Sequence, residues 1–137
     1  MTINIGTLAR NRAGAAITDL INTGSVAPGG YLETRSGLKP TTPQVAATGI
    51  LLCTNNFSNP SFGNYTNGSS NVNTIANGTI VANGTAGWFR IYNRDGVAVL
   101  DGDISITGGT GNLQFPSTSF LLGGTVAITS GTATMPQ

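Results

Sequence analysis

The chain has 137 residues, a length typical of one domain with one hydrophobic core. Only 8% of the residues are charged, against about a quarter in ordinary soluble domains, and the formal net charge is +1. So few charges give little electrostatic protection against association, and we expect much of the surface to contact other protein. Histidine is absent, which removes the commonest general base and the commonest metal ligand.

The N-terminus predicts a short apolar arm at residues 1–6, through Ile3 and Ile5, and then a helix over residues 7–23. Thr7 is the predicted N-cap, and Gly24 ends the helix. Apolar residues at helical spacing predict the face that turns inward, either against a sheet or against a neighbouring subunit. The residues of this predicted inward face are Leu8, Ala9, Ala13, Ala16, Ile17, Leu20 and Ile21.

The remainder of the chain, residues 31–137, predicts a β-sandwich or jelly roll, because short strand-like segments alternate with Gly-rich turns. The fold class is therefore mainly β, a single domain with one N-terminal α-helix. The predicted strands are residues 31–36, 50–53, 79–82, 88–93, 97–100, 103–107, 112–115, 119–122, 125–130 and 132–135.

Residues 86–103 predict a complete β-hairpin, with side chains of alternating character before the turn at residues 93–96. Trp88 lies in the apolar first strand and is predicted to be buried. Cys53, the single cysteine, lies in another apolar run and is predicted to be a buried free thiol.

Residues 54–77 are rich in Asn, Gly and Ser and predict a long loop. A structureless loop of this length is uncommon in a compact domain, so we expect either an exposed functional loop or a segment ordered against a partner. Phe57, Phe62 and Tyr65 are the side chains that could anchor the loop to a partner, but we expect them to pack into the local core instead. Lys39 and Pro40 begin an extended linker that contains a second proline.

Few residues have the character of a catalytic or ligand site. Asp95, Asp101 and Asp103 could supply a carboxylate pair for glycoside hydrolysis or part of a calcium loop, but acids beside hairpin turns more often form the turns. The basic residues are scattered, which argues against nucleic-acid binding, although Arg10 and Arg12 could contact an acidic partner surface. We predict no catalytic residue, cofactor or metal site. We also predict no membrane span, and we expect the chain to be synthesised in the cytoplasm.

Several segments, in this order and spacing, resemble a family of small structural proteins of tailed bacteriophages and prophages. The segments are the helix from Leu8-Ala9-Arg10-Asn11 onward, residues 31–37, Ala47-Thr48-Gly49-Ile50-Leu51-Leu52, Ser58-Asn59-Pro60-Ser61-Phe62-Gly63, Gly84-Thr85-Ala86-Gly87-Trp88-Phe89-Arg90-Ile91, Asp95-Gly96 with Val99-Leu100-Asp101-Gly102, and residues 123–130. The Asn-rich residues 64–77 depart from the family pattern.

The resemblance implies a virion component without enzymatic activity, similar to capsid decoration or cement proteins. Such proteins bind the outer surface of the major capsid protein shell, often as trimers, so the implied partners are the major capsid protein and further copies of this chain. One alternative is a structural protein of the tail or the head-to-tail junction. Another is a carbohydrate-binding or receptor-binding module that uses Tyr65, Trp88 or Tyr92 as stacking platforms.

For the assembly reading, the predicted contact residues are the arm, the start of the helix, the linker and the loop aromatics. They are Ile3, Ile5, Leu8, Arg10, Arg12, Lys39, Pro40, Phe57, Phe62 and Tyr65.

Overall fold

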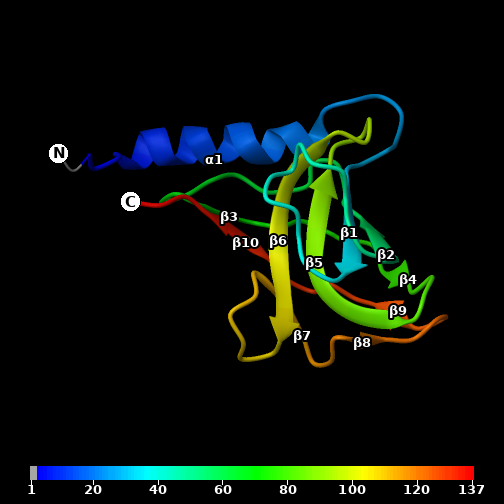
Figure 1. The fold of residues 1–137 in the computed structure, drawn as a ribbon. Coiled ribbons are helices and arrows are strands. Elements are labelled where there is room, and N and C mark those ends of the chain that lie inside the picture. The colour runs from blue at the N-terminus through cyan, green and yellow to red at the C-terminus, as the bar shows by residue number, and fades with distance from the viewer. Residues whose placement is uncertain (1–2) are drawn as a thin grey trace.

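The computed structural model describes residues 3–137 and has the predicted fold class, a mainly β, sandwich-like fold with an N-terminal helix (Figure 1). Residues 1–2 of the expected arm lie outside the described part. The elements are α1 (Thr7–Asn22), β1 (Tyr31–Ser36), β2 (Leu51–Asn56), β3 (Ser69–Asn71), β4 (Gly78–Thr79), β5 (Gly84–Tyr92), β6 (Ala98–Ile106), β7 (Leu113–Phe115), β8 (Ser119–Phe120), β9 (Thr125–Val126) and β10 (Thr132–Thr134).

The largest sheet has the strand order β2-β1-β5-β6-β7, and β8 pairs with the start of β5. All pairs in this sheet are antiparallel except β6 with β7. The sheet curls into a half-barrel, and two small sheets, β10-β3 and β4-β9, lie across its open side (Figure 1).

The register of the central strands gives the sheet two different faces. Leu32 pairs with Ile91, which pairs with Leu100, and these side chains turn toward the small sheets. Successive residues of a strand point to opposite faces, so the neighbouring positions form the outer face. The buried apolar core consists of Ile21, Leu32, Leu52, Cys53, Phe57, Ile80, Ala86, Phe89, Ile91, Ile104, Phe115, Phe120 and Val126.

The hairpin predicted at residues 86–103 is confirmed as β5, β6 and the turn between them. Asn93 closes the turn, because its side-chain oxygen accepts hydrogen bonds from the backbone N–H groups of Asp95 (3.0 Å) and Val97 (2.8 Å). Gly96 has a φ of 79°, a conformation that favours glycine. β6 is one continuous strand of nine residues where two shorter strands were predicted.

The long loop predicted at residues 54–77 is instead an ordered part of the fold that contains strand residues. Residues 54–56 complete β2, Ser69–Asn71 forms β3, and single bridges join Phe57 to Ile75 and Phe62 to Val72. The buried side chain of Asn55 donates hydrogen bonds to the carbonyl oxygens of Ala76 and Val126, both at 3.0 Å. Side-chain amides and backbone pairing therefore order a segment whose composition suggests a loop.

Of the residues predicted to form the inward face of the helix, only Ile21 packs against the body of this chain. The residues of α1 that are buried against the body are Gly14, Thr18 and Ile21. Leu8, Ala9, Ala13, Ala16, Ile17 and Leu20 are exposed. Gly14 lies so close to Tyr65 that a Cβ at this position would be 2.1 Å from a carbon of the Tyr65 ring. The helix packs through an apolar side chain at Ile21, but at Gly14 only a glycine allows so close an approach of the Tyr65 ring. Thr7 does not cap the helix: Gly6 is the N-cap residue, without a side-chain hydrogen bond.

We expect Gly14→Ala to destabilise the fold although alanine favours helix by about 1 kcal/mol. The added methyl group overlaps the Tyr65 ring, and overpacking of this kind costs about 1–3 kcal/mol. Thermal and urea unfolding of the purified chain would measure the change. Tyr65→Ala removes the overlap, so the double variant should lose less than the sum of the two single variants. Additive losses would contradict this account of how α1 is seated.

Candidate assembly interface

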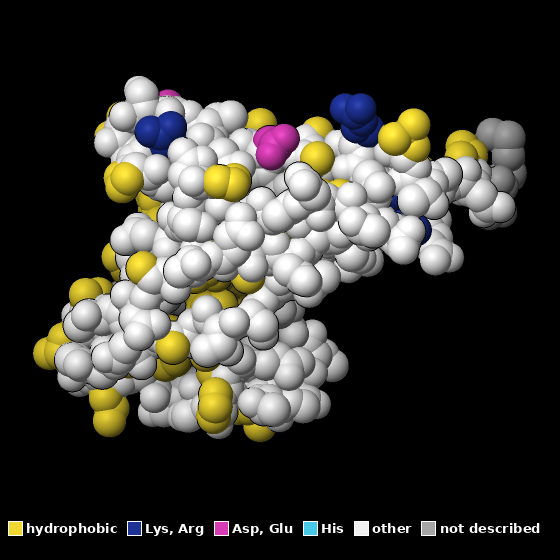
Figure 2. Space-filling model, turned by 180° about the vertical axis from the view of Figure 1, so that it is seen from behind, with side chains coloured by type: hydrophobic (Ala, Val, Ile, Leu, Met, Phe, Trp, Pro, Cys, Tyr) yellow, Lys and Arg dark blue, Asp and Glu magenta, His cyan; other side chains and the backbone are white. Residues whose placement is uncertain are grey.

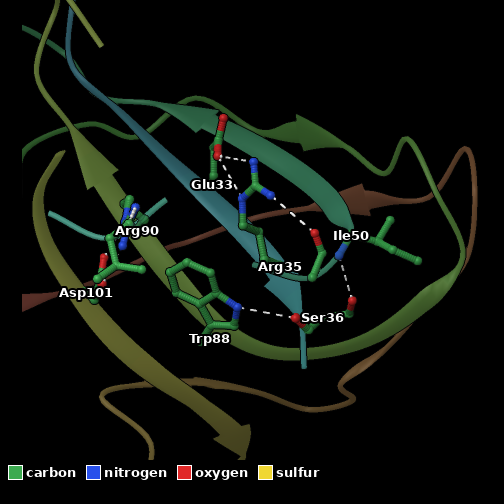
Figure 3. Close-up of polar contacts among 9 residues, drawn as sticks. Glu33, Arg35, Ser36, Ile50, Trp88, Arg90 and Asp101 are labelled. Atoms are coloured by element: carbon green, nitrogen blue, oxygen red, sulfur yellow. Dashed lines mark hydrogen bonds and ion pairs between the residues drawn. The ribbon is translucent and has the colours of Figure 1, made fainter. Parts of the chain in front are cut away.

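The outer face of the large sheet carries paired polar side chains from three strands (Figure 3). Glu33 of β1 lies opposite Arg90 of β5, which lies opposite Asp101 of β6. Arg90 donates hydrogen bonds to both carboxylate oxygens of Asp101, at 2.6 Å and 2.8 Å. Glu33 pairs instead with Arg35 of its own strand, at 2.9 Å. The hydrogen bonds to Asp101 raise the pKa of Arg90 above its ordinary value, so Arg90 stays charged.

The segment 37–50, which we call the strap, covers this outer face. Arg90 donates hydrogen bonds to the carbonyl oxygens of Val45 (2.8 Å) and Thr42 (3.5 Å) of the strap. Trp88 donates one to Ser36 at 3.2 Å and has no exposed surface, and the Arg90 guanidinium lies 5.3 Å from its ring centre. Trp88 is buried, as predicted, but under the strap rather than in the main core. It cannot serve as a stacking platform for a sugar.

The other carboxylates are also engaged, with one exception. Asp95 accepts hydrogen bonds from the backbone N–H groups of Ser25 (2.7 Å) and Val26 (3.1 Å), and Asp103 pairs with Lys39. Asp19 is exposed on α1. Within residues 3–137, no three Cys, Asp or Glu side chains gather closely enough to hold a metal ion.

The charged side chains are concentrated on one part of the molecule. Residues 51–89 and 104–137, together more than half of the chain, contain no Asp, Glu, Lys or Arg. Seen from behind, the upper part of the molecule around α1 carries dark blue and magenta side chains, and the lower part only white and yellow ones (Figure 2). We call the surface formed by residues 51–89 and 104–137 the uncharged surface.

One end of the uncharged surface presents large apolar side chains. Val81, Leu121 and Leu122 are between 57% and 67% exposed. The two segments that carry them lie together, because Leu122 donates a backbone hydrogen bond to the side chain of Asn83 (2.8 Å). Depletion of charge with apolar residues exposed is typical of the centre of a protein–protein interface.

A second apolar surface follows α1, on the side away from the body. Leu8 is 72% exposed and Leu20 is 51% exposed, and Ala9, Ala13, Ala16 and Ile17 lie between them on the exposed side. Ile3 and Ile5 continue it beyond the start of the helix. The residues predicted to bury the helix are thus available for a contact outside this chain.

Three hollows are lined entirely or mostly by residues 51–89 and 104–137, one of them beside Pro116. An apolar groove of about 250 Å³ opens between the large sheet and the small sheets, with Phe62, Val72 and Leu113 in its lining. A larger and more polar hollow of about 760 Å³ lies beside Pro60, and Asn73 is one of the residues that line it.

The predicted contact residues fall into three groups. Ile3, Ile5, Leu8 and Arg12 are exposed along the arm and α1, and Lys39 is exposed on the strap. Arg10, Phe62 and Tyr65 are half-buried, and Arg10 donates a hydrogen bond to the Met135 carbonyl at 2.8 Å. Pro40 and Phe57 are buried, so neither presents a surface to a partner. The predicted contact residues that are exposed, in the arm, the helix and at Lys39, are therefore accessible to a partner, whereas the loop aromatics pack against other parts of this chain.

Sequence reasoning missed the uncharged surface and its apolar end at Val81, Leu121 and Leu122. The signal was present, because two long segments without any charge can be read directly from the chain. What the sequence lacks is the topology that places these two segments beside each other through β4-β9 and β5-β8.

No protein-family model, no curated protein and no solved structure matches this chain. No helix within residues 3–137 is long and apolar enough to cross a membrane.

The hairpin turn predicts an acid-dependent stability. Hydrogen bonds from Ser25 and Val26 lower the pKa of Asp95 below its ordinary value. A carboxyl group with a depressed pKa stabilises the fold above its unfolded pKa of about 4, and this contribution is lost as the pH falls through the folded pKa. As the pH is lowered below about 4, we expect the melting temperature of the Asp95→Asn variant to fall less than that of the wild type.

Asp19→Asn is the matched control, because it removes the same charge from an aspartate that is exposed on α1. This variant should keep the acid dependence of the wild type. Equal slopes for Asp95→Asn and the wild type would contradict the role assigned to Asp95.

The two aspartates of β6 predict a difference in unfolding free energy. Asp101→Ala leaves the buried Arg90 without its counterion, a change that costs about 3–5 kcal/mol. Asp103→Ala changes the net charge equally but breaks only the exposed pair with Lys39, which costs less than about 1 kcal/mol. Urea unfolding would measure the unfolding free energy of both variants. Similar losses for the two variants would contradict the larger contribution assigned to the pair of Arg90 with Asp101.

Proposed function

We propose that this chain is a non-enzymatic structural protein of a bacteriophage virion, a cement protein that binds the outer surface of the major capsid shell and stabilises it. The observation that carries the proposal is the uncharged surface of residues 51–89 and 104–137. A protein that works alone in solution needs charge across its surface to limit association, and more than half of this chain provides none.

The uncharged surface suits a permanent contact for an energetic reason. Burying an ionised side chain at an interface costs several kcal/mol unless it is paired, whereas neutral amides and hydroxyls need only a hydrogen-bond partner. The apolar end at Val81, Leu121 and Leu122 supplies a dry centre, and the Asn, Ser and Thr side chains around it supply hydrogen bonds. We assign this surface to the capsid.

The engagement of the carboxylates supports a structural role over an enzymatic one. Glu33, Asp95, Asp101 and Asp103 are each held by a cation or by backbone N–H groups. Such groups are positioned for structure, because a general acid or base must be free to exchange a proton with a substrate. A cement protein needs no such group. Binding to the assembled shell and not to free subunits adds its binding free energy to the stability of the shell.

The proposal predicts that the purified chain binds capsids that lack it and raises their melting temperature. Co-sedimentation with shells of the virus that encodes the chain would measure binding, and calorimetry would measure the shift. Leu122→Glu places a charge at the apolar end and should weaken binding at least about tenfold. Leu38→Glu is the matched control, because Leu38 is 89% exposed on the strap, and its binding should be unchanged.

Absence of binding together with an unchanged melting temperature of the shell would overturn the proposal. Densitometry of whole virions provides a second reading. A cement protein should approach the copy number of the capsid protein, whereas a few copies per particle would assign the chain to the tail or to the head-to-tail junction.

A further inference from the structure

We propose that two copies of this chain associate through the exposed face of α1, with the two helices antiparallel. This contact is separate from the uncharged surface and requires no capsid. Ala9, Ala13, Ala16 and Leu20 are exposed and follow one another at intervals of four, three and four residues. On a helix this spacing forms one seam, which a second helix can cover.

The charges of the chain identify a second copy as the occupant. Nine of the eleven charged side chains form an ion pair or a hydrogen bond within residues 3–137. The remaining two are Arg12 and Asp19, and both are exposed on α1. They have opposite signs, and being seven residues apart they lie on the same flank of the seam.

This arrangement is complementary to itself when the helices are antiparallel. A twofold axis between the two positions brings Arg12 of each copy toward Asp19 of the other, so both unpaired charges gain a partner. In a parallel pair Arg12 would face the apolar Ile17 of the other helix, and neither charge would be satisfied. The charges therefore favour a twofold contact over the threefold assembly that the family resemblance implies.

The ends of the helices extend the apolar contact. In the antiparallel arrangement, the arm of one copy runs past the end of α1 in the other copy. Ile3 and Ile5 of the arm are exposed, and Val26, which follows α1, is 84% exposed. The helix itself is only about 24 Å long at 1.5 Å per residue, so we expect a reversible dimer rather than a permanent one.

Sedimentation equilibrium of the full chain over a range of concentrations tests the proposal. The wild type should show a monomer–dimer equilibrium, weaker at high salt because exposed charges are screened. Arg12→Glu and Asp19→Arg each create two like-charge pairs and should raise the dissociation constant at least about tenfold. The double variant Arg12→Glu with Asp19→Arg exchanges the signs and should restore dimerisation.

Lys39→Glu and Asp103→Arg are the matched controls. They reverse the other exposed pair of charges, with the same changes in net charge, and should leave dimerisation as in the wild type. A chain that stays monomeric at the highest concentration would overturn the proposal. A trimer, or a double variant that fails to restore the dimer while its circular dichroism is unchanged, would also overturn it.

Discussion

The register of β1, β5 and β6 is the constraint on which the rest of the structure depends. It aligns Leu32, Ile91 and Leu100 on the inner face, and it aligns Glu33, Arg90 and Asp101 on the outer face. A shift of one residue would exchange these faces and place Arg90 in the apolar core. Because Arg90 also holds the strap through Val45, the same register decides how the outer face is covered. The buried pair with Asp101 therefore favours the native register over a shifted one.

The outer face also explains where the charge of the molecule lies. Glu33, Arg35, Lys39, Arg90, Asp101 and Asp103 all belong to the sheet face or to the strap above it. This group is more than half of the charged side chains of the chain. Since these residues satisfy one another locally, they contribute little to the field around the rest of the surface. The uncharged surface thus exists because more than half of the charged side chains lie on the outer face of the large sheet and in the strap, where they pair with one another.

The sequence predicts the parts of the fold that local patterns determine. The hairpin around Asn93 and Gly96 was predictable because turn chemistry and alternation agree there, and so was the burial of Trp88 and Cys53. The seating of α1 was not. The usual rule takes the apolar stripe as the buried side, but Gly14 and Thr18 meet the body because Tyr65 reaches under the helix. That contact joins residues about fifty positions apart, and no local pattern encodes it.

An uncharged β surface carries a risk of unspecific pairing, and the chain limits this risk by its strand lengths. β4, β8 and β9 are two residues each, and β3, β7 and β10 are three. Strands this short offer few free N–H and C=O groups to another chain. Glycines at 123 and 124 and Pro116 interrupt the segments between them, and proline has no N–H group to donate to a neighbouring strand. Recognition by this surface must therefore come from its side chains, which a partner has to match in shape and in hydrogen bonding.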